Sequence, residues 1–260
     1  MANTSMSTPG KYLYGFVEGG FKLAGELLGL ANAPVRSIRL EDIAAIVSDH
    51  PVEKLSLLRK NVEPHHRVIR EISAQSTLIP ATFGHISDTD EQILAVLRDN
   101  HTEIREELRR LLGKAEMGVK LLWDVDNIFD FFVGVDRELR SRRDRVFGKS
   151  RPTLEDKLEL GAFFDKLHRR ERERLGSQII EALRPVTCEF RVNAPAEEKM
   201  ALNAAFLIER AREKEFEEAL YRAAGLFDSN FALDYNGPWP PYNFVRLTLK
   251  PAVAEAAARS

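Results

Sequence analysis

Two adjacent histidines, His65 and His66, are the first candidates for chemistry, because imidazole nitrogens bind metal ions and transfer protons. Neighbouring positions on a helix point about 100° apart, so the two rings would not face one ligand together. No cysteine, histidine or carboxylate stands at the spacing that completes a common metal site. We therefore expect a packing or hydrogen-bonding role for the pair, and neither a metal nor a cofactor.

The tripeptide Gly148-Lys149-Ser150 matches the end of a phosphate-binding P-loop. That motif requires a glycine five positions before its last glycine, and Arg143 stands there. The flanking residues also have a helical pattern, whereas a P-loop follows a strand. A nucleotide site is not expected at this position.

Nucleophile and carboxylate candidates are few. Cys188 alternates with Phe190 and Val192, so we predict that it shares a buried strand face, and it has no activating partner nearby in sequence. Asp124 and Asp126 follow a predicted strand, and a helix cap accounts for them. No Ser-His-Asp arrangement, glycine elbow or carboxylate pair is present. The sequence therefore predicts that the protein is not an enzyme.

Basic residues cluster in one helical region, but acidic residues dilute them. The cluster comprises Arg137, Arg140, Arg142, Arg143, Arg145, Lys149 and Arg151. Asp136, Glu138 and Asp144 lie among them, and His168–Arg174 alternates in sign. The whole chain has 38 basic and 40 acidic residues, a net charge of -2, which differs from the basic excess of nucleic-acid binders. We expect a solvated helix surface and no nucleic-acid partner.

The composition predicts a globular, cytoplasmic protein. The 260 residues suffice for one large domain or two ordinary ones, and 44% of them are hydrophobic. A single cysteine fits a reducing compartment. The first residues lack the features of a signal peptide, and no apolar run approaches the roughly 20 residues of a membrane helix. We expect residues 1–10 to be disordered, residues 251–260 to form a flexible tail, and no membrane association.

Residues 11–114 are predicted to form an N-terminal α/β domain with the order β-α-β-β-α-β. A helix is expected between residues 18 and 29 despite four glycines, and a second helical region is expected to open at Pro51, with Pro64 kinking it or starting another helix. A long helix capped by Ser87 or Asp88 should follow. The predicted strands are Lys11–Val17, Val35–Leu40, Ile43–Ser48 and the extended segment Thr77–Gly84, and the long helix is Asp90–Leu112.

Residues 115–250 are predicted to repeat this order with a helical hairpin insertion. Pro152 should interrupt the long helical region, and the period alone leaves Met200–Ile208 open between helix and strand. An apolar stripe on the last part of that region suits internal packing or a partner helix; it comprises Leu158, Phe164, Leu167, Leu175, Ile179 and Leu183. The other elements are strands Gly118–Asp124, Val186–Val192 and Phe231–Tyr235, and helices within Asn127–Leu183 and Glu213–Ala224. The fold class is thus α+β, with two domains of β-α-β-β-α-β, ferredoxin-like order, the second carrying long helical additions.

A proline-rich aromatic motif follows the last predicted strand. Its members are Gly237, Pro238, Trp239, Pro240, Pro241, Tyr242 and Phe244. Its prolines cannot continue a helix or lie in a central strand, and its aromatic rings are costly to expose. It contains no acid, base or nucleophile. We therefore expect a structural turn that holds the last strand, or a partner-contact motif, and no catalytic role.

Seven segments, in order along nearly the whole chain, together resemble the gas vesicle protein F/L family (GvpF/GvpL). They are Tyr12–Val17, Ala44–Ser48, His65–Ile69, Ile79–Gly84, Gly113–Lys120 with Trp123, Leu202–Ile208 and Gly237–Phe244. The resemblance implies an α/β N-terminal domain, a ferredoxin-like C-terminal domain with helical additions, and a strand at Met200–Ile208. It implies no enzymatic activity.

The resemblance also implies a function in forming gas vesicles, the hollow protein shells that give some microbes buoyancy. Family members are accessory or minor structural proteins, in the cytoplasm or on the gas vesicle. They are expected to bind the small apolar shell protein and other accessory proteins during nucleation or assembly. Two alternatives stay open: an RNA-binding ferredoxin-like module, although no aromatic RNA-binding run is present, and an enzyme with an unrecognised site.

Overall fold

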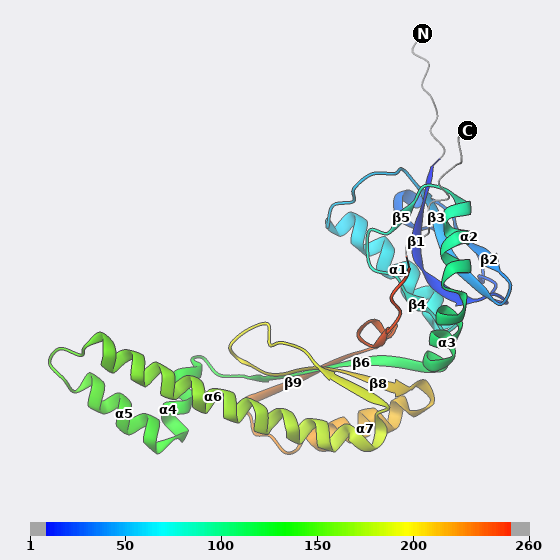
Figure 1. The fold of residues 1–260 in the computed structure, drawn as a ribbon. Coiled ribbons are helices and arrows are strands. Elements are labelled where there is room, and N and C mark those ends of the chain that lie inside the picture. Colours follow the sequence, from blue (N-terminus) through cyan, green and yellow to red (C-terminus); the bar gives the residue numbers. More distant parts are fainter. Residues whose placement is uncertain (1–8, 251–260) are drawn as a thin grey trace, which may run out of the picture. The chain divides into compact units, whose positions relative to one another are not determined.

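The computed structural model describes residues 9–250, which divide into two compact units (Figure 1). Residues 9–115 and 238–250 form the first unit, and Glu116–Gly237 form the second. The predicted second domain ended at residue 250, whereas residues 238–250 lie with the first unit. Most of the predicted disordered N-terminus, and the predicted tail, lie outside the described residues. No helix in residues 9–250 is long and apolar enough to cross a membrane.

The first unit is built on an antiparallel sheet with the order β2-β3-β1-β4, and β5 also pairs with β1. The strands are β1 (Gly10–Glu18), β2 (Val35–Leu40), β3 (Ile43–His50), β4 (Ile79–Pro80) and β5 (Ile86–Ser87). Every residue of β1 except Glu18 is buried. This follows from its central place, because α1 packs on one face of the sheet and α2 and α3 pack on the other.

Three α-helices belong to the first unit: α1 (Arg59–Gln75), α2 (Asp90–Asp99) and α3 (His101–Leu111). The predicted helix between residues 18 and 29 does not form, and only the short 3-10 helix η1 (Leu30–Asn32) follows. Gly25 has a φ of 85°, a left-handed conformation that a right-handed helix excludes. The predicted order β-α-β-β-α-β is therefore wrong for this unit, although its mixed α+β character is confirmed.

Two further helix predictions for the first unit need correction. The second helix begins at Arg59 instead of Pro51, and Pro64 lies inside one continuous helix. The long helix predicted from Asp90 is two helices separated at Asn100, whose φ and ψ of -124° and 19° are not helical. Its cap is Thr89, whose hydroxyl accepts a hydrogen bond from the Gln92 N–H at 3.3 Å.

The second unit contains a sheet with the order β7-β8-β6-β9. Its strands are β6 (Lys114–Trp123), β7 (Glu189–Val192), β8 (Met200–Glu209) and β9 (Phe231–Trp239). Its α-helices are α4 (Ile128–Val135), α5 (Arg137–Phe147), α6 (Leu154–Leu183) and α7 (Glu213–Ala224). Along the chain, three helices thus follow β6, and α7 follows β8. Met200–Glu209 is a strand, so the ambiguity of the apolar pattern is resolved.

The helix α6 covers one face of the second sheet. Thr153 and Asp156 form a reciprocal capping box at its start, which satisfies two N–H groups of the first turn. Five residues of the predicted apolar stripe are buried: Phe164, Leu167, Leu175, Ile179 and Leu183. Leu158, the first member of the stripe, is exposed. Internal packing therefore accounts for the stripe except at its N-terminal end.

The prediction that Cys188 shares a buried strand face is wrong. Cys188 is exposed, and so are Phe190 and Val192. Apolar alternation predicts a strand but does not say whether that strand is central or peripheral. Since β7 pairs only with β8 and ends the order of the sheet, its neighbours cover it from one side only.

Candidate functional site

The proline-rich aromatic motif begins within β9, an edge strand of the second sheet. Gly237 has a φ of 130°, and a Cβ atom there would lie 2.8 Å from the Glu116 carbonyl oxygen and from Met117 Sδ. Only glycine meets both conditions without strain. Pro238 is tolerated in the same strand because an edge position leaves one side of the backbone without a ladder hydrogen bond.

The rest of the motif forms a tight turn in the first unit. The Tyr242 N–H donates to the Pro240 carbonyl at 2.8 Å, and the Phe244 N–H donates to the Pro241 carbonyl at 3.0 Å. Phe244 is fully buried, Tyr242 is half-buried, and Trp239 is exposed. The three aromatic rings therefore differ in environment: Phe244 packs in the core, whereas Trp239 is partly exposed to solvent.

Residues 245–250, the C-terminal segment, continue from this turn along α3. Arg110 donates to the Phe244 carbonyl, and the Arg246 N–H donates to Glu107 Oε1 at 2.7 Å. The Lys250 N–H donates to Asn100 Oδ1 at 2.7 Å. Three alternating apolar side chains of the segment line a hollow of about 440 Å³ together with residues of β1 and β4: Val245, Leu247 and Leu249. No sequence pattern pointed to this arrangement, because its partners lie more than 130 residues apart.

The two adjacent histidines lie in different environments. His65 is buried and packs among aromatic rings, with its Nδ1 2.9 Å from the Tyr12 hydroxyl oxygen. His66 is exposed, and its Nδ1 lies 3.4 Å from the Tyr242 hydroxyl oxygen. The structure therefore brings the histidine pair together with the aromatic motif, two features that the sequence left separate.

Burial, followed by the nearby His66, lowers the pKa of His65 from 6.5 to about 4, so the ring is neutral at pH 7. In the unfolded chain, His65 has the ordinary pKa of 6.5 and binds a proton more readily than in the folded protein. The contribution of His65 to stability is therefore complete above pH 6.5 and is lost as the pH falls toward 4. Wild-type protein should lose about 2 kcal/mol of unfolding free energy through this residue between pH 7.5 and pH 5.

Urea unfolding of wild type, His65→Gln and His66→Gln at these two pH values tests the assignment. His65→Gln should lower stability at the higher pH but remove this part of the pH dependence. His66→Gln, at the exposed neighbouring position, should keep most of it. An equal pH dependence in wild type and His65→Gln would contradict the neutral, buried state of His65.

Within residues 9–250, one group of carboxylates and histidine has metal-like spacing: Glu41, Asp42 and His101. His101 Nε2 lies 2.8 Å from Asp42 Oδ1, and the Arg105 guanidinium lies 3.9 Å from Asp42 Oδ2. A fixed cation beside the same carboxylate competes with a metal ion. The group is better described as a polar cluster that joins the β2–β3 turn to α3.

The basic cluster of residues 137–151 is paired with carboxylates in part. Arg142 pairs with Glu138 at 2.7 Å and lies over the Phe163 ring, and Lys149 Nζ lies 2.6 Å from Asp156 Oδ1. Lys149 is thus engaged by a carboxylate instead of being presented to a phosphate. These contacts agree with a solvated helix surface.

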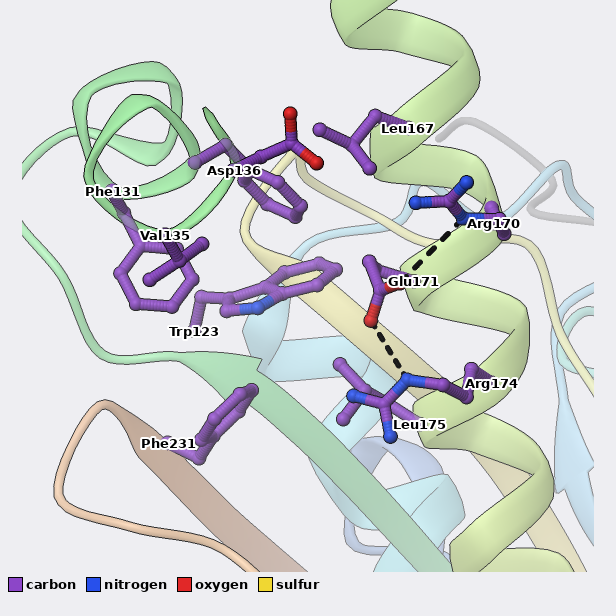
Figure 2. A pocket seen from close by; sticks show the side chains of 11 residues that line it. Trp123, Phe131, Val135, Asp136, Leu167, Arg170, Glu171, Arg174, Leu175 and Phe231 are labelled. Atoms are coloured by element: carbon purple, nitrogen blue, oxygen red, sulfur yellow. Dashed lines mark hydrogen bonds and ion pairs between the residues drawn. The ribbon is translucent and has the colours of Figure 1, made fainter. Parts of the chain in front are cut away.

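A pocket of about 320 Å³ with an aromatic wall lies in the second unit. Figure 2 shows the side chains that line it. Trp123, at the end of β6, forms part of its wall together with side chains from α4, α6 and β9. Glu171 lies between Arg170 and Arg174 on α6 and pairs with both, at 3.7 and 2.7 Å. The pocket lining comprises Trp123, Phe131, Phe132, Val135, Asp136, Leu167, Arg170, Glu171, Arg174, Leu175 and Phe231. Its aromatic and aliphatic side chains suit an apolar group, and three of its charged side chains pair with one another.

Residues 9–250 thus form a two-unit, mixed α+β protein whose polar side chains at these sites are mostly engaged with one another. The chain belongs to the GvpL/GvpF family: the family model described as gas vesicle synthesis protein GvpL/GvpF matches residues 10–246. The resemblance to this family read from the sequence is confirmed.

Relatives of both types in the family are similar over most of their length. Gas vesicle protein F of a Streptomyces species is 30% identical over 240 residues, covering 90% of this chain and 98% of the relative. Gas vesicle protein L1 of Halobacterium salinarum is 26% identical, covering 90% of each chain. The crystal structure of the gas vesicle protein GvpF from Anabaena has a TM-score of 0.82 at 25% identity, covering 93% of this chain and 100% of that one.

Proposed function

We propose that this protein is an accessory factor of gas vesicle formation that binds the apolar shell protein and other accessory proteins during nucleation or assembly. The observation that carries the proposal is the family match over residues 10–246. We place the protein in the cytoplasm and on the gas vesicle, without a nucleic-acid or membrane partner. A non-catalytic role is in line with the pairing of its polar groups.

A soluble partner for an apolar shell protein needs apolar surface that a folded protein can expose safely. The pocket of Figure 2 supplies a candidate, because its aromatic wall continues to the exposed Val135 on α4. Helix-in-groove docking places apolar side chains of a partner helix in such a hollow. The paired charges of Arg170, Glu171 and Arg174 would then surround a dry contact.

For the second unit we propose a ferredoxin-like fold with helical additions. The second unit has the order β6, helices, β7, β8, α7, β9 and the sheet order β7-β8-β6-β9, which supports a ferredoxin-like arrangement with helical additions. For the motif from Gly237 to Phe244 we propose a structural turn. The buried Phe244 and the hydrogen bonds of the turn support this role.

Recovery of shell protein on the tagged protein tests the binding role. Val135→Asp should reduce recovery about tenfold, because a charge at the pocket rim must be desolvated on docking. The matched control is Val52→Asp in the first unit, since the two valines are similarly exposed, at 63% and 59%. Both variants should retain wild-type stability within about 0.5 kcal/mol.

Vesicle formation in cells tests the function itself. Deletion of the gene should abolish or strongly reduce vesicles, and wild-type protein supplied in trans should restore them. Normal vesicles in the deletion strain would contradict the accessory function. Restored vesicles with Val135→Asp, together with unchanged recovery of shell protein, would contradict the pocket as the binding surface.

A further inference from the structure

The helix α3 carries three basic side chains on one face, because His101, Arg105 and Arg109 stand four residues apart. At the start of the helix, His101 Nε2 lies 2.8 Å from Asp42 Oδ1 and 3.5 Å from Glu41 Oε2. Arg105 is more distant, with its Nη1 3.9 Å from Asp42 Oδ2. In residues 9–250, the Arg109 side chain has no hydrogen bond or ion pair. The carboxylates of the β2–β3 turn thus match one end of this basic stripe and leave the other end unmatched.

A hollow of about 270 Å³ lies beside the unmatched end, between α3 and the ends of β1 and β2. Arg39 joins Arg105 and Arg109 in its lining; its Nε donates to the Glu41 carbonyl at 2.7 Å, and its other N–H groups have no partner among the described residues. Glu18 and Asp42 also line the hollow, so three guanidinium groups and two carboxylates give a net charge of +1. No atom lies within 4 Å of the place where a Cβ of Gly20 would stand, so this side of the hollow is open.

Arg105 offers this hollow an unused pair of donors. Its Nε is shielded from solvent and has no hydrogen-bond partner in the part of the chain that the structure describes. Nε and Nη2 form the edge of a guanidinium that matches the two oxygens of a carboxylate, and Asp42 lies beside the other nitrogen, Nη1. A buried N–H of a charged group is costly without an acceptor, so this edge favours a ligand that supplies one.

We propose that the hollow binds one carboxylate group, with Arg105 as the bidentate donor and Arg109 and Arg39 as flanking donors. A carboxylate brings two acceptor oxygens and the single negative charge that balances the net charge of +1. A doubly charged phosphate would leave excess negative charge beside Glu18 and Asp42. The carboxylate belongs to a small organic acid or to an acidic side chain of a partner protein. The site lies in the first unit and is independent of the shell-protein pocket proposed in the second.

Nuclear magnetic resonance of the ¹⁵N-labelled arginine Nε–H groups tests the site in the full chain. Sodium acetate is titrated at constant ionic strength, and so is a blocked five-residue alanine peptide with one central glutamate. The signals of Arg105 and Arg109 should shift and saturate with both probes, and a glutamine version of the peptide should cause no shift. Arg98, exposed on α2 and without a side-chain partner among the described residues, is the internal control. Tighter binding of the glutamate peptide than of acetate assigns the site to a protein side chain, and equal binding assigns it to a free acid.

Three variants separate the site from general electrostatic attraction. Arg109→Gln should weaken acetate binding about tenfold, since it removes charged hydrogen-bond donors. Glu18→Gln should strengthen binding about threefold, because it removes a carboxylate that repels the ligand, and misfolding cannot produce a gain. Glu106→Gln changes the net charge equally on an exposed part of α3 outside the hollow, and should leave binding unchanged. No saturable shift at Arg105, an equal shift at Arg98, or equal effects of Glu18→Gln and Glu106→Gln would overturn the proposal.

Discussion

Replacing Trp123 by alanine should lower the unfolding free energy of the second unit by about 3–5 kcal/mol. Trp123 is only 2% exposed, and its ring lies 4.8 Å from the His168 ring and 5.6 Å from the Phe132 ring. It is also 6.4 Å from the Phe231 ring on β9. Because these three neighbouring rings come from three different elements, α4, α6 and β9, the vacated volume cannot be refilled by moving one side chain, and most of the cavity cost remains.

The chain contains its own control for this experiment, since its second tryptophan, Trp239, is 38% exposed. Trp239→Ala should cost less than about 1.5 kcal/mol. Each variant retains one tryptophan, so fluorescence-monitored urea unfolding follows each in turn, with circular dichroism as a second probe. Equal losses in the two variants would show that the second unit does not depend on the aromatic cluster around Trp123.

The sequence predicted the elements whose signals are local. The apolar run Ile43–Ser48 predicted β3 correctly. The alternation within Val186–Val192 predicted β7, because pleated strands expose successive side chains to opposite faces, but β7 covers only Glu189–Val192, and Val186 ends the 3-10 helix η2 (Arg184–Val186). The mixed α+β class followed from the same patterns. Residue 188 shows where this reasoning fails: whether a strand face is buried depends on which neighbours flank it, and strand order is a non-local property.

Helix boundaries failed for a similar reason. The periodic apolar pattern runs through Asn100, but the helix ends there. The Asn100 side chain donates to the Val96 carbonyl at 2.8 Å and accepts from the N–H of Lys250, 150 residues away. A tertiary contact thus stabilises the break. In the candidate sites, the residue types indicated a packing or hydrogen-bonding role for the histidine pair. They did not indicate that Tyr242 contacts His66, because the two residues are distant in sequence and meet only in the folded chain.

The hydrogen-bonding network around Glu107 is the second place where one substitution should have a large effect. Both oxygens of its buried carboxylate accept hydrogen bonds from the Arg110 guanidinium, each at 2.8 Å. Oε1 also accepts one from the Arg246 N–H at 2.7 Å. Glu107→Ala should lower the unfolding free energy of the first unit by about 3–5 kcal/mol, because it leaves Arg110 without its carboxylate partner and frees the C-terminal segment. Glu106→Ala, at the exposed neighbouring position, should cost less than about 0.5 kcal/mol.

The pH dependence separates the charge of Glu107 from its shape. Burial raises the pKa of Glu107, but Arg110 and the Arg246 N–H lower it more, and the result lies below the ordinary value of 4.5. Its contribution to stability is therefore complete above that value and is lost as the pH falls through the lowered pKa. Glu107→Gln keeps the shape and an acceptor for Arg246, so it should be less stable than wild type at neutral pH and should lose less on acidification. Hydrogen exchange of residues 245–250 should rise in Glu107→Ala and stay unchanged in Glu106→Ala; unchanged exchange in both would show that Glu107 does not hold the segment.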